Sequence, residues 1–168
     1  MNKTYIGIDN GVSGTIGVIF DTGQSSFIKT PVKKEQNYTK KKANISRILA
    51  KDLFSFLSEV KNIAGENPIF CFIERPMVDP TRFTATTSAL RALEATLMVV
   101  ELLDIPHEYI DSKAWQKELL PNGCKGDALK TASKDIGCRL FPQHKELIVK
   151  HKDADGILIA EYAKRKNF

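Results

Sequence analysis

Four acidic residues lie at positions in the sequence where they could bind a metal ion. Asp9 ends the apolar run TYIGID, Glu74 ends the apolar run PIFCFIE, and Asp153 and Asp155 lie in HKDADG near the C-terminus. If the strands that end in Asp9 and Glu74 are parallel neighbours, their carboxylates lie close together. Two close carboxylates repel each other and require a shared proton or a cation. Mg²⁺ takes oxygen ligands and bridges carboxylates to phosphate oxygens, so the pattern favours a metal centre.

Each acid taken alone also has a simpler explanation. An acid at a strand end is often a turn former, and an Asp at a helix start is often a cap. The helix dipole favours acids at the same place. Only the joint pattern of two strand ends and one helix start favours a metal site.

Short runs rich in β-branched and aromatic residues must position these acids. They predict an antiparallel meander of strands at residues 4–9, 15–20 and 25–30. The run Pro68–Glu74 is typical of a strand buried on both faces, and Pro106–Asp111 is a further short strand.

Helical spacing of apolar residues recurs in the rest of the chain. The predicted helices run from a cap at Asn44 or Ser46 to about Val60, over Thr87–Leu103, through SKAWQKEL, through KGDALKTASKDIGCRL, and from about Asp153 to Lys164. The basic stretch KKEQNYTKKK, residues 33–42, has no apolar period and is predicted to be a loop or an extended arm.

The order β-β-β-α-β-α-β-α-α-α defines the fold class. A meander followed by βαβ crossovers predicts an α/β protein with a mixed five-stranded sheet and helices on both faces. The 168 residues suit a single domain over residues 1–168, without internal repeats or a linker.

Composition narrows the class of protein. With 42% hydrophobic and 27% charged residues, the chain is typical of a soluble globular protein. No segment approaches the ~18–20 apolar residues that span a bilayer, and no signal peptide is seen. We therefore expect a cytoplasmic protein of the cytosol or nucleoid. The three cysteines form no CxxC pair, which argues against disulfide scaffolds and zinc knuckles. A net charge of +5 is compatible with a polyanionic partner.

Several of these stretches together resemble one known family. IGIDNGVSGTIGVI, FIERP and DADGILIAEY resemble, in order, the first strands, the Ile-Glu strand end and the closing helix of the RuvC-like Holliday-junction resolvases. DSKAWQKEL and KGDALKTA resemble the intervening stretch of phage-type members. The resemblance covers nearly the whole chain. It implies an RNase H-like fold, a homodimer, and Mg²⁺-dependent cleavage of four-way DNA junctions by a crossover junction endodeoxyribonuclease.

The resemblance also implies a set of metal ligands. In this family four carboxylates, or three and a histidine, bind two metals. Asp9, Glu74 and Asp155 map onto the first, second and last ligands. The remaining ligand usually lies three residues before the last, where this chain has Lys152, which cannot bind a metal while protonated.

Asp153 and His151 are the candidates for the remaining ligand. Residues two apart in a regular helix point roughly 200° apart, so Asp153 can join Asp155 only if it lies before the first turn. His151, four residues before Asp155, has the right helical phase only if the helix begins that early. We favour Asp153, with His151 as the alternative; a role for Asp153 as a cap alone stays open.

The implied mechanism is two-metal hydrolysis with two Mg²⁺ ions per site, for which Mn²⁺ substitutes. Asp9 would bridge both metals and Glu74 would hold the metal on the leaving side. Asp153 and Asp155 would hold the metal that activates water. A lysine close to the site could add to the neutralisation of phosphate charge, and Lys113 and Lys125 are candidates from their positions in the sequence, although solvated surface would explain them equally well.

Basic and apolar side chains are the predicted DNA contacts. In the resembling enzymes the loop after the second acid meets the junction centre, where Phe83 or Met77 could act as a wedge, and Thr87–Leu103 would be the dimer helix. Solvated surface, or packing of that helix on its own sheet, would explain the same residues. The predicted DNA-binding residues are Lys33, Lys34, Lys40, Lys41, Lys42, Arg75, Arg82, Phe83, Lys113 and Lys125.

Three other functions fit parts of the pattern. DNGVSGTIGVI also resembles the first phosphate loop of actin-like and sugar-kinase ATPases, but these need two such domains. Another RNase H-like nuclease would keep the metal site and act on different branched or hybrid substrates. A junction-binding protein without catalysis would account for Lys152.

Overall fold

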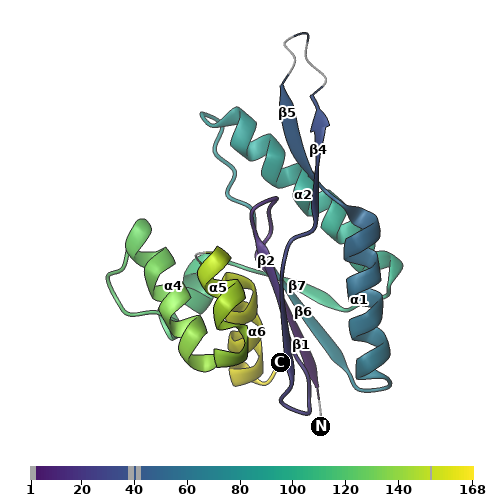
Figure 1. The fold of residues 1–168 in the computed structure, drawn as a ribbon, viewed down its shortest axis with the longest axis vertical. Coiled ribbons are helices and arrows are strands. Elements are labelled where there is room, and N and C mark those ends of the chain that lie inside the picture. Colours follow the sequence, from purple (N-terminus) through teal and green to yellow (C-terminus); the bar gives the residue numbers. More distant parts are fainter. Residues whose placement is uncertain (1–2, 38–39, 41–42, 152) are drawn as a thin grey trace.

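The computed structural model describes residues 3–37, 40, 43–151 and 153–168. Its centre is a five-stranded sheet of order β3-β2-β1-β6-β7 (Figure 1). β1 pairs antiparallel with β2, and β2 with β3, whereas β6 is parallel to both β1 and β7. The predicted mixed α/β sheet is therefore confirmed. Its strands are β1 (Thr4–Ile8), β2 (Thr15–Ile19), β3 (Ser25–Lys29), β6 (Ile69–Glu74) and β7 (His107–Ile110).

Helices cover both faces of the sheet, as predicted. One apolar core joins the sheet to α1 and α2, and a second joins its other face to α3, α4, α5 and α6. A short 3₁₀ turn, Pro142–His144, leads into α5. The helices are α1 (Ala50–Ala64), α2 (Phe83–Leu102), α3 (Ser112–Leu119), α4 (Asp127–Leu140), α5 (Lys145–His151) and α6 (Asp155–Lys166).

The alternating direction of side chains along β1 and β6 decides on which face of the sheet Asp9 and Glu74 lie. Ile6 and Ile8 lie in the core under α1 and α2, and Tyr5 lies in the core under α6. Because successive side chains of a strand point to opposite faces, Asp9 follows on the α6 face. The same alternation places Glu74 on that face, two residues after Phe72, which also packs in the α6 core.

α6 lies directly on the backbones of β1 and β2. A Cβ on Gly156 would lie 2.4 Å from the carbonyl oxygen of Thr15, and one on Gly17 would lie 2.2 Å from the Cα of Ile157. The Thr15 hydroxyl also accepts a hydrogen bond of 3.0 Å from the Gly156 N–H. Glycine at both positions allows the start of α6 to come this close to the sheet.

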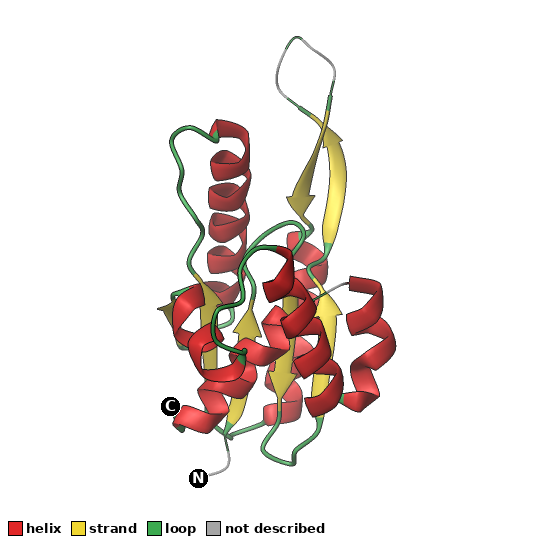
Figure 2. Ribbon diagram, turned by 90° about the vertical axis from the view of Figure 1, so that its left-hand side faces the viewer, coloured by secondary structure: helices red, strands yellow, loops and turns green. Residues whose placement is uncertain are grey.

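The basic stretch is a strand-paired hairpin rather than a loop or an unpaired arm. β4 (Val32–Gln36) pairs antiparallel with β5 (Asn44–Ile48). The prediction that residues 44–48 open a helix is therefore wrong, and so are its predicted caps. Ile48 packs in the core under α2, which fixes this segment as a strand. The hairpin and the N-terminal half of α2 extend beyond the same end of the main sheet (Figure 2).

The helix boundaries also differ from the prediction. α1 begins at Ala50 after Leu49, which provides no side-chain cap, and α5 was not predicted. The last helix begins at Asp155 rather than Asp153.

α2 begins at Phe83, one turn earlier than predicted. The hydroxyl of Thr86 donates a 2.8 Å hydrogen bond to the carbonyl oxygen of Asp79 and accepts one of 3.0 Å from the Asp79 N–H. These bonds join the first turn to the preceding loop. Although α2 has 20 residues, neither it nor any other helix in the described ranges is both long and apolar enough to cross a membrane.

Candidate metal centre

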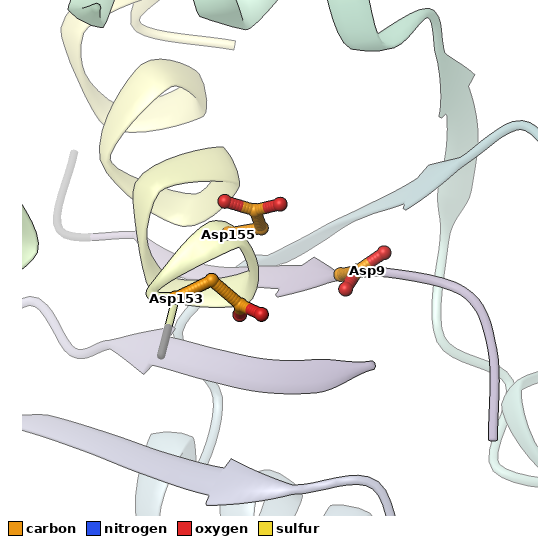
Figure 3. Close-up of side chains that lie close together, drawn as sticks. All are labelled: Asp9, Asp153 and Asp155. Atoms are coloured by element: carbon orange, nitrogen blue, oxygen red, sulfur yellow. The ribbon is translucent and has the colours of Figure 1, made fainter. Parts of the chain in front are cut away.

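Three carboxylates converge at the end of β1. One oxygen each from Asp9, Asp153 and Asp155 lie within 4.8 Å of one another. Asp9 directly follows β1, Asp155 is the first residue of α6, and Asp153 precedes that helix (Figure 3). Residues 144 positions apart in the chain are thus brought together by the packing of α6 on β1.

The start of α6 lets Asp153 and Asp155 share one site. Ala154 lies between them with φ −132° and ψ 22°, outside the helical region. Asp153 therefore escapes the opposite orientation that a regular helix would impose. The geometric condition for Asp153 to act with Asp155 is met; metal binding by either residue stays a prediction.

The alternative ligand, His151, lies at the end of α5. Its ring meets the ring of Phe27 edge-on, with the centroids 6.4 Å apart. His151 is not one of the three residues that gather within 4.8 Å in the described part of the chain. Lys152, the departure from the family pattern, lies outside the described residues.

Glu74 lies beside this group at the end of β6. The pairing of β1 with β6 runs to Ile8 opposite Ile73, so Asp9 and Glu74 are the next residues along the two strands. The indole N–H of Trp115 donates a 2.7 Å hydrogen bond to Oε2 of Glu74. Because Trp115 is fully buried in α3, it holds this carboxylate in a fixed orientation.

The environment of Asp9 disfavours its charged form. Burial raises the pKa of Asp9 well above its usual value, and the negative charges of Asp155, Glu74 and Asp153 raise it further. The positive charge of Lys130 opposes this rise. A cation at the site would relieve the same repulsion.

The pKa values of the other three acids are also raised. Burial raises the pKa of Glu74 to about 7, against the effect of its hydrogen bond from Trp115. Burial raises the pKa of Asp155 to about 6, against the effect of its hydrogen bond from Ser133. The pKa of Asp153 is raised chiefly by burial, which a backbone hydrogen bond from Asp155 opposes.

The prediction from sequence missed two residues of α4 that face this site. The Ser133 hydroxyl donates to Oδ1 of Asp155, and Lys130 is the lysine whose charge acts on Asp9, Asp153 and Asp155. The sequence did contain one indication that Ser133 has a buried polar partner. This serine lies between Leu129 and Ile136 on the apolar side of α4, where a buried hydroxyl needs a partner.

The donor set fits a hard divalent cation. All the converging atoms are carboxylate oxygens, which are the ligands that Mg²⁺ and Mn²⁺ accept. Oδ1 of Asp153 is buried and has no hydrogen-bond partner among the described residues. An unpartnered, buried carboxylate oxygen is costly, and coordination to a cation would satisfy it.

Comparisons with known proteins bear on the fold. The sequence matches no protein-family model and no curated protein. Among solved structures, a Thermus thermophilus RuvC described as in complex with Holliday junction substrate matches with a TM-score of 0.52 and 12% identity, over 98% of this chain and 96% of that chain. The fold is RuvC-like. A second T. thermophilus RuvC structure matches with a TM-score of 0.50 and 13% identity over the same shares. The phage-type assignment within this RuvC-like fold stays a prediction.

The basic residues predicted to bind DNA are spread over several elements of the RuvC-like fold. Lys33 and Lys34 are exposed on β4, and Lys40 is exposed near the hairpin tip. Glu35 forms ion pairs with Lys33 and with Arg47, the second at 2.8 Å. Lys41 and Lys42 lie outside the described residues.

The other predicted contacts lie on the loop after β6, at the start of α2, on α3 and before α4. The loop after β6 carries Arg75, which forms a 3.6 Å ion pair with Asp111, and the exposed Arg82. Met77 is 78% exposed and Phe83 is 77% exposed. Lys113 in α3 and Lys125 before α4, the two lysines predicted to add positive charge near the metals, are exposed. The lysine whose charge acts on the acids is instead Lys130.

Proposed function

We propose that this protein is a metal-dependent endonuclease that resolves four-way DNA junctions. The observation that carries the proposal is the convergence of Asp9, Asp153 and Asp155 at the end of β1. The RuvC-like fold supports it, because one matching structure is a RuvC described with a Holliday junction substrate.

The four acids would hold two Mg²⁺ ions, with Asp9 as the shared ligand. This role suits Asp9 because the charges of Asp155, Glu74 and Asp153 all act on it. When bound, such ions activate water and neutralise the charge that builds on a phosphate.

The protein side chains would orient this site. Trp115 fixes Glu74 through its 2.7 Å hydrogen bond, so this acid is positioned before a ligand arrives. Lys130 is exposed and brings a positive charge to the same group of acids. It would thereby favour a phosphodiester next to the carboxylates.

The projecting elements would contact the arms of the junction. The β4–β5 hairpin and the start of α2 extend beyond one end of the sheet (Figure 2). Asp9 directly follows β1 and Glu74 is the last residue of β6, so both lie at the C-terminal ends of these strands. Lysines of the hairpin would neutralise phosphates of an arm, and exposed Phe83 and Met77 would meet bases near the crossover.

A homodimer would bring two such sites to one junction. A four-way junction must be cut in two strands to be resolved, which needs two active sites in a symmetric arrangement. We propose α2 as the dimer helix, because its Leu90, Met98 and Leu102 are 40%, 62% and 71% exposed.

A cleavage assay with a synthetic four-way junction tests the proposal. We expect Mg²⁺-dependent, paired nicks at symmetric positions, which Asp9→Asn abolishes while junction binding in the absence of metal remains. Asp52→Asn is the control, because it is the same change at an exposed position of α1; this variant should cut normally.

Two results would redirect the assignment. Tight junction binding without any cleavage product in Mg²⁺ or Mn²⁺ would indicate a junction-binding protein that is not a nuclease. Preferential cleavage of an RNA–DNA hybrid would instead indicate a different nuclease of the same fold.

A further inference from the structure

Helix α4 contacts the segment that carries two of the three converging acids. Ser133 is buried in α4, and its hydroxyl donates to Oδ1 of Asp155. The hydroxyl oxygen of Ser133 also accepts a 3.0 Å hydrogen bond from the N–H of Ala154. One side chain thus binds both the backbone between the two acids and one of their carboxylates.

The packing around Ser133 makes this contact close. A Cβ on Gly137, one turn further along α4, would lie 2.2 Å from the Cβ of Ala154. Ala154 is itself fully buried. The backbone between Asp153 and Asp155 is therefore enclosed by α4 on one side and by the sheet on the other.

We propose that Ser133 is a positioning residue that sets the convergence of Asp153 and Asp155 before any metal binds. This inference rests on the proposed metal-dependent function. Ala154 has non-helical dihedral angles, and its N–H needs a partner that α6 does not supply. The Ser133 hydroxyl supplies that partner and orients the Asp155 carboxylate in the same contact.

Loss of the hydroxyl would release both constraints. The Ala154 N–H would be buried without a partner, and Asp155 would turn away from Asp9 and Asp153 under charge repulsion. Outer partners of metal ligands typically change metal affinity by roughly 10- to 100-fold when they are removed. We expect a loss of that size in Ser133→Ala, with Ser133→Cys close to it because a thiol is a weak donor.

Calorimetric titration of the metal-free protein with Mn²⁺ tests this directly, without using activity. Ser133→Ala should bind Mn²⁺ roughly 10- to 100-fold more weakly than the unchanged protein, while junction affinity without metal stays the same. Ser58→Ala is the matched control. Its hydroxyl oxygen in α1 is also buried and has no hydrogen-bond partner among the described residues, so Mn²⁺ affinity should not change.

A positioning role also predicts that excess metal restores function. The cleavage rate of Ser133→Ala should approach normal as Mn²⁺ is raised, whereas that of Asp9→Asn should not. Equal Mn²⁺ affinity in the unchanged protein, Ser133→Ala and Ser133→Cys would overturn the proposal. If Ser133→Ala does not fold, as judged by circular dichroism, Ser133→Cys gives the same test at nearly equal volume.

The test separates the two proposals. Mn²⁺ binding that weakens in Ser133→Ala, in a protein that cuts no junction, would overturn the proposed function alone. Junction cleavage with unaltered Mn²⁺ affinity in Ser133→Ala would overturn the role of Ser133 alone. Absence of Mn²⁺ binding by the unchanged protein would overturn both.

Discussion

Glu74 and Asp155 are the acids whose titration is most open to measurement. Burial raises their pKa values to about 7 and about 6. In the unfolded chain both groups would lose their protons near pH ~4. Between about pH 4 and about pH 7 the folded, metal-free protein holds more protons than the unfolded chain. Its stability therefore falls as pH rises through this range.

We therefore predict that the melting temperature of the metal-free protein decreases between about pH 4 and about pH 7. Glu74→Gln should flatten this decrease, because glutamine does not titrate and still accepts the hydrogen bond from Trp115. Saturating Mg²⁺ should raise the melting temperature most at the upper end of the range, where the acids are ionised.

Comparing the melting curves of the unchanged protein and Glu74→Gln over this pH range corrects for other titrating groups. The pKa values of His144 and His151 are lowered, chiefly by burial, and these histidines act in the opposite sense because their contribution to stability is lost as pH falls. They are common to both proteins, so the difference between the curves isolates Glu74. Parallel curves would show that Glu74 is not perturbed.

Asp9, Glu74 and Asp155 were predictable from the sequence because each ends or opens an element with its own local signal, whereas Asp153 belongs to no helix or strand. Asp9 and Glu74 end apolar runs, and Asp155 opens an apolar helix. Lys130 and Ser133 were not predictable in the same way. Their distance from the acids depends on how α4 packs against α6, which no local pattern records.

At the scale of elements, the contact of α6 with the sheet decides where Asp155 lies. Gly156→Ala would place a Cβ 2.4 Å from the carbonyl oxygen of Thr15, a backbone atom that cannot rotate away. We predict a loss of about 1–3 kcal/mol in the free energy of unfolding, typical of overpacking, together with weaker Mn²⁺ binding. Urea denaturation and calorimetry measure the two effects.

Gly123→Ala is the control for the general cost of replacing a glycine. A Cβ there meets no atom within 4 Å, although its φ of 86° disfavours alanine. It should cost about 1–2 kcal/mol and leave metal binding unchanged. If Gly156→Ala behaves like Gly123→Ala in both measurements, the close packing is not what positions the acid.

The hairpin is the second element with a testable role. Replacing Lys33, Lys34 and Lys40 with glutamine should weaken junction binding and reduce the dependence of log affinity on log salt by up to roughly 0.9 for each lost phosphate contact. Mn²⁺ affinity should not change, because these lysines belong to the β4–β5 hairpin and not to the main sheet, at the end of which the carboxylates lie.

A control with the same change in net charge separates contact from general attraction. Lys117, Lys145 and Lys164 are exposed on α3, α5 and the far end of α6. Their replacement by glutamine should alter the salt dependence less. An equal effect of the two triple variants would remove the hairpin from the DNA-binding surface.

The hairpin also shows why local patterns misjudge an element. Ile45 and Ile48 are three residues apart and suit the first turn of a helix. Their pairing with Glu35 and Val32 requires contacts across the hairpin, and Ile48 requires the core under α2. Tertiary packing here overrides the helical spacing.

At the scale of the whole molecule, the proposed dimer links structure to the outcome of cleavage. Met98→Glu with Leu102→Glu should place charges on the exposed side of α2 and yield a monomer in light scattering. The monomer should nick one strand at a time, because two sites no longer meet on one junction. Leu147→Glu, at a side chain 45% exposed on α5, is the control and should remain dimeric.

A monomeric unchanged protein that still makes paired nicks would contradict the dimer. A dimer that survives both α2 substitutions would place the interface on another surface of the molecule.

The sequence by itself determined the fold class and three candidate ligands, Asp9, Glu74 and Asp155, and it left the fourth open between Asp153 and His151. Strand and helix periods are local properties, and so is the placement of an acid at the end of an apolar run. Only the tertiary structure decided the spatial relations that a metal site needs. Asp153 and Asp155 come close to Asp9 through the non-helical Ala154, the glycine contacts under α6 and the hydroxyl of Ser133. Such convergence depends on how elements pack and not on spacing along the chain.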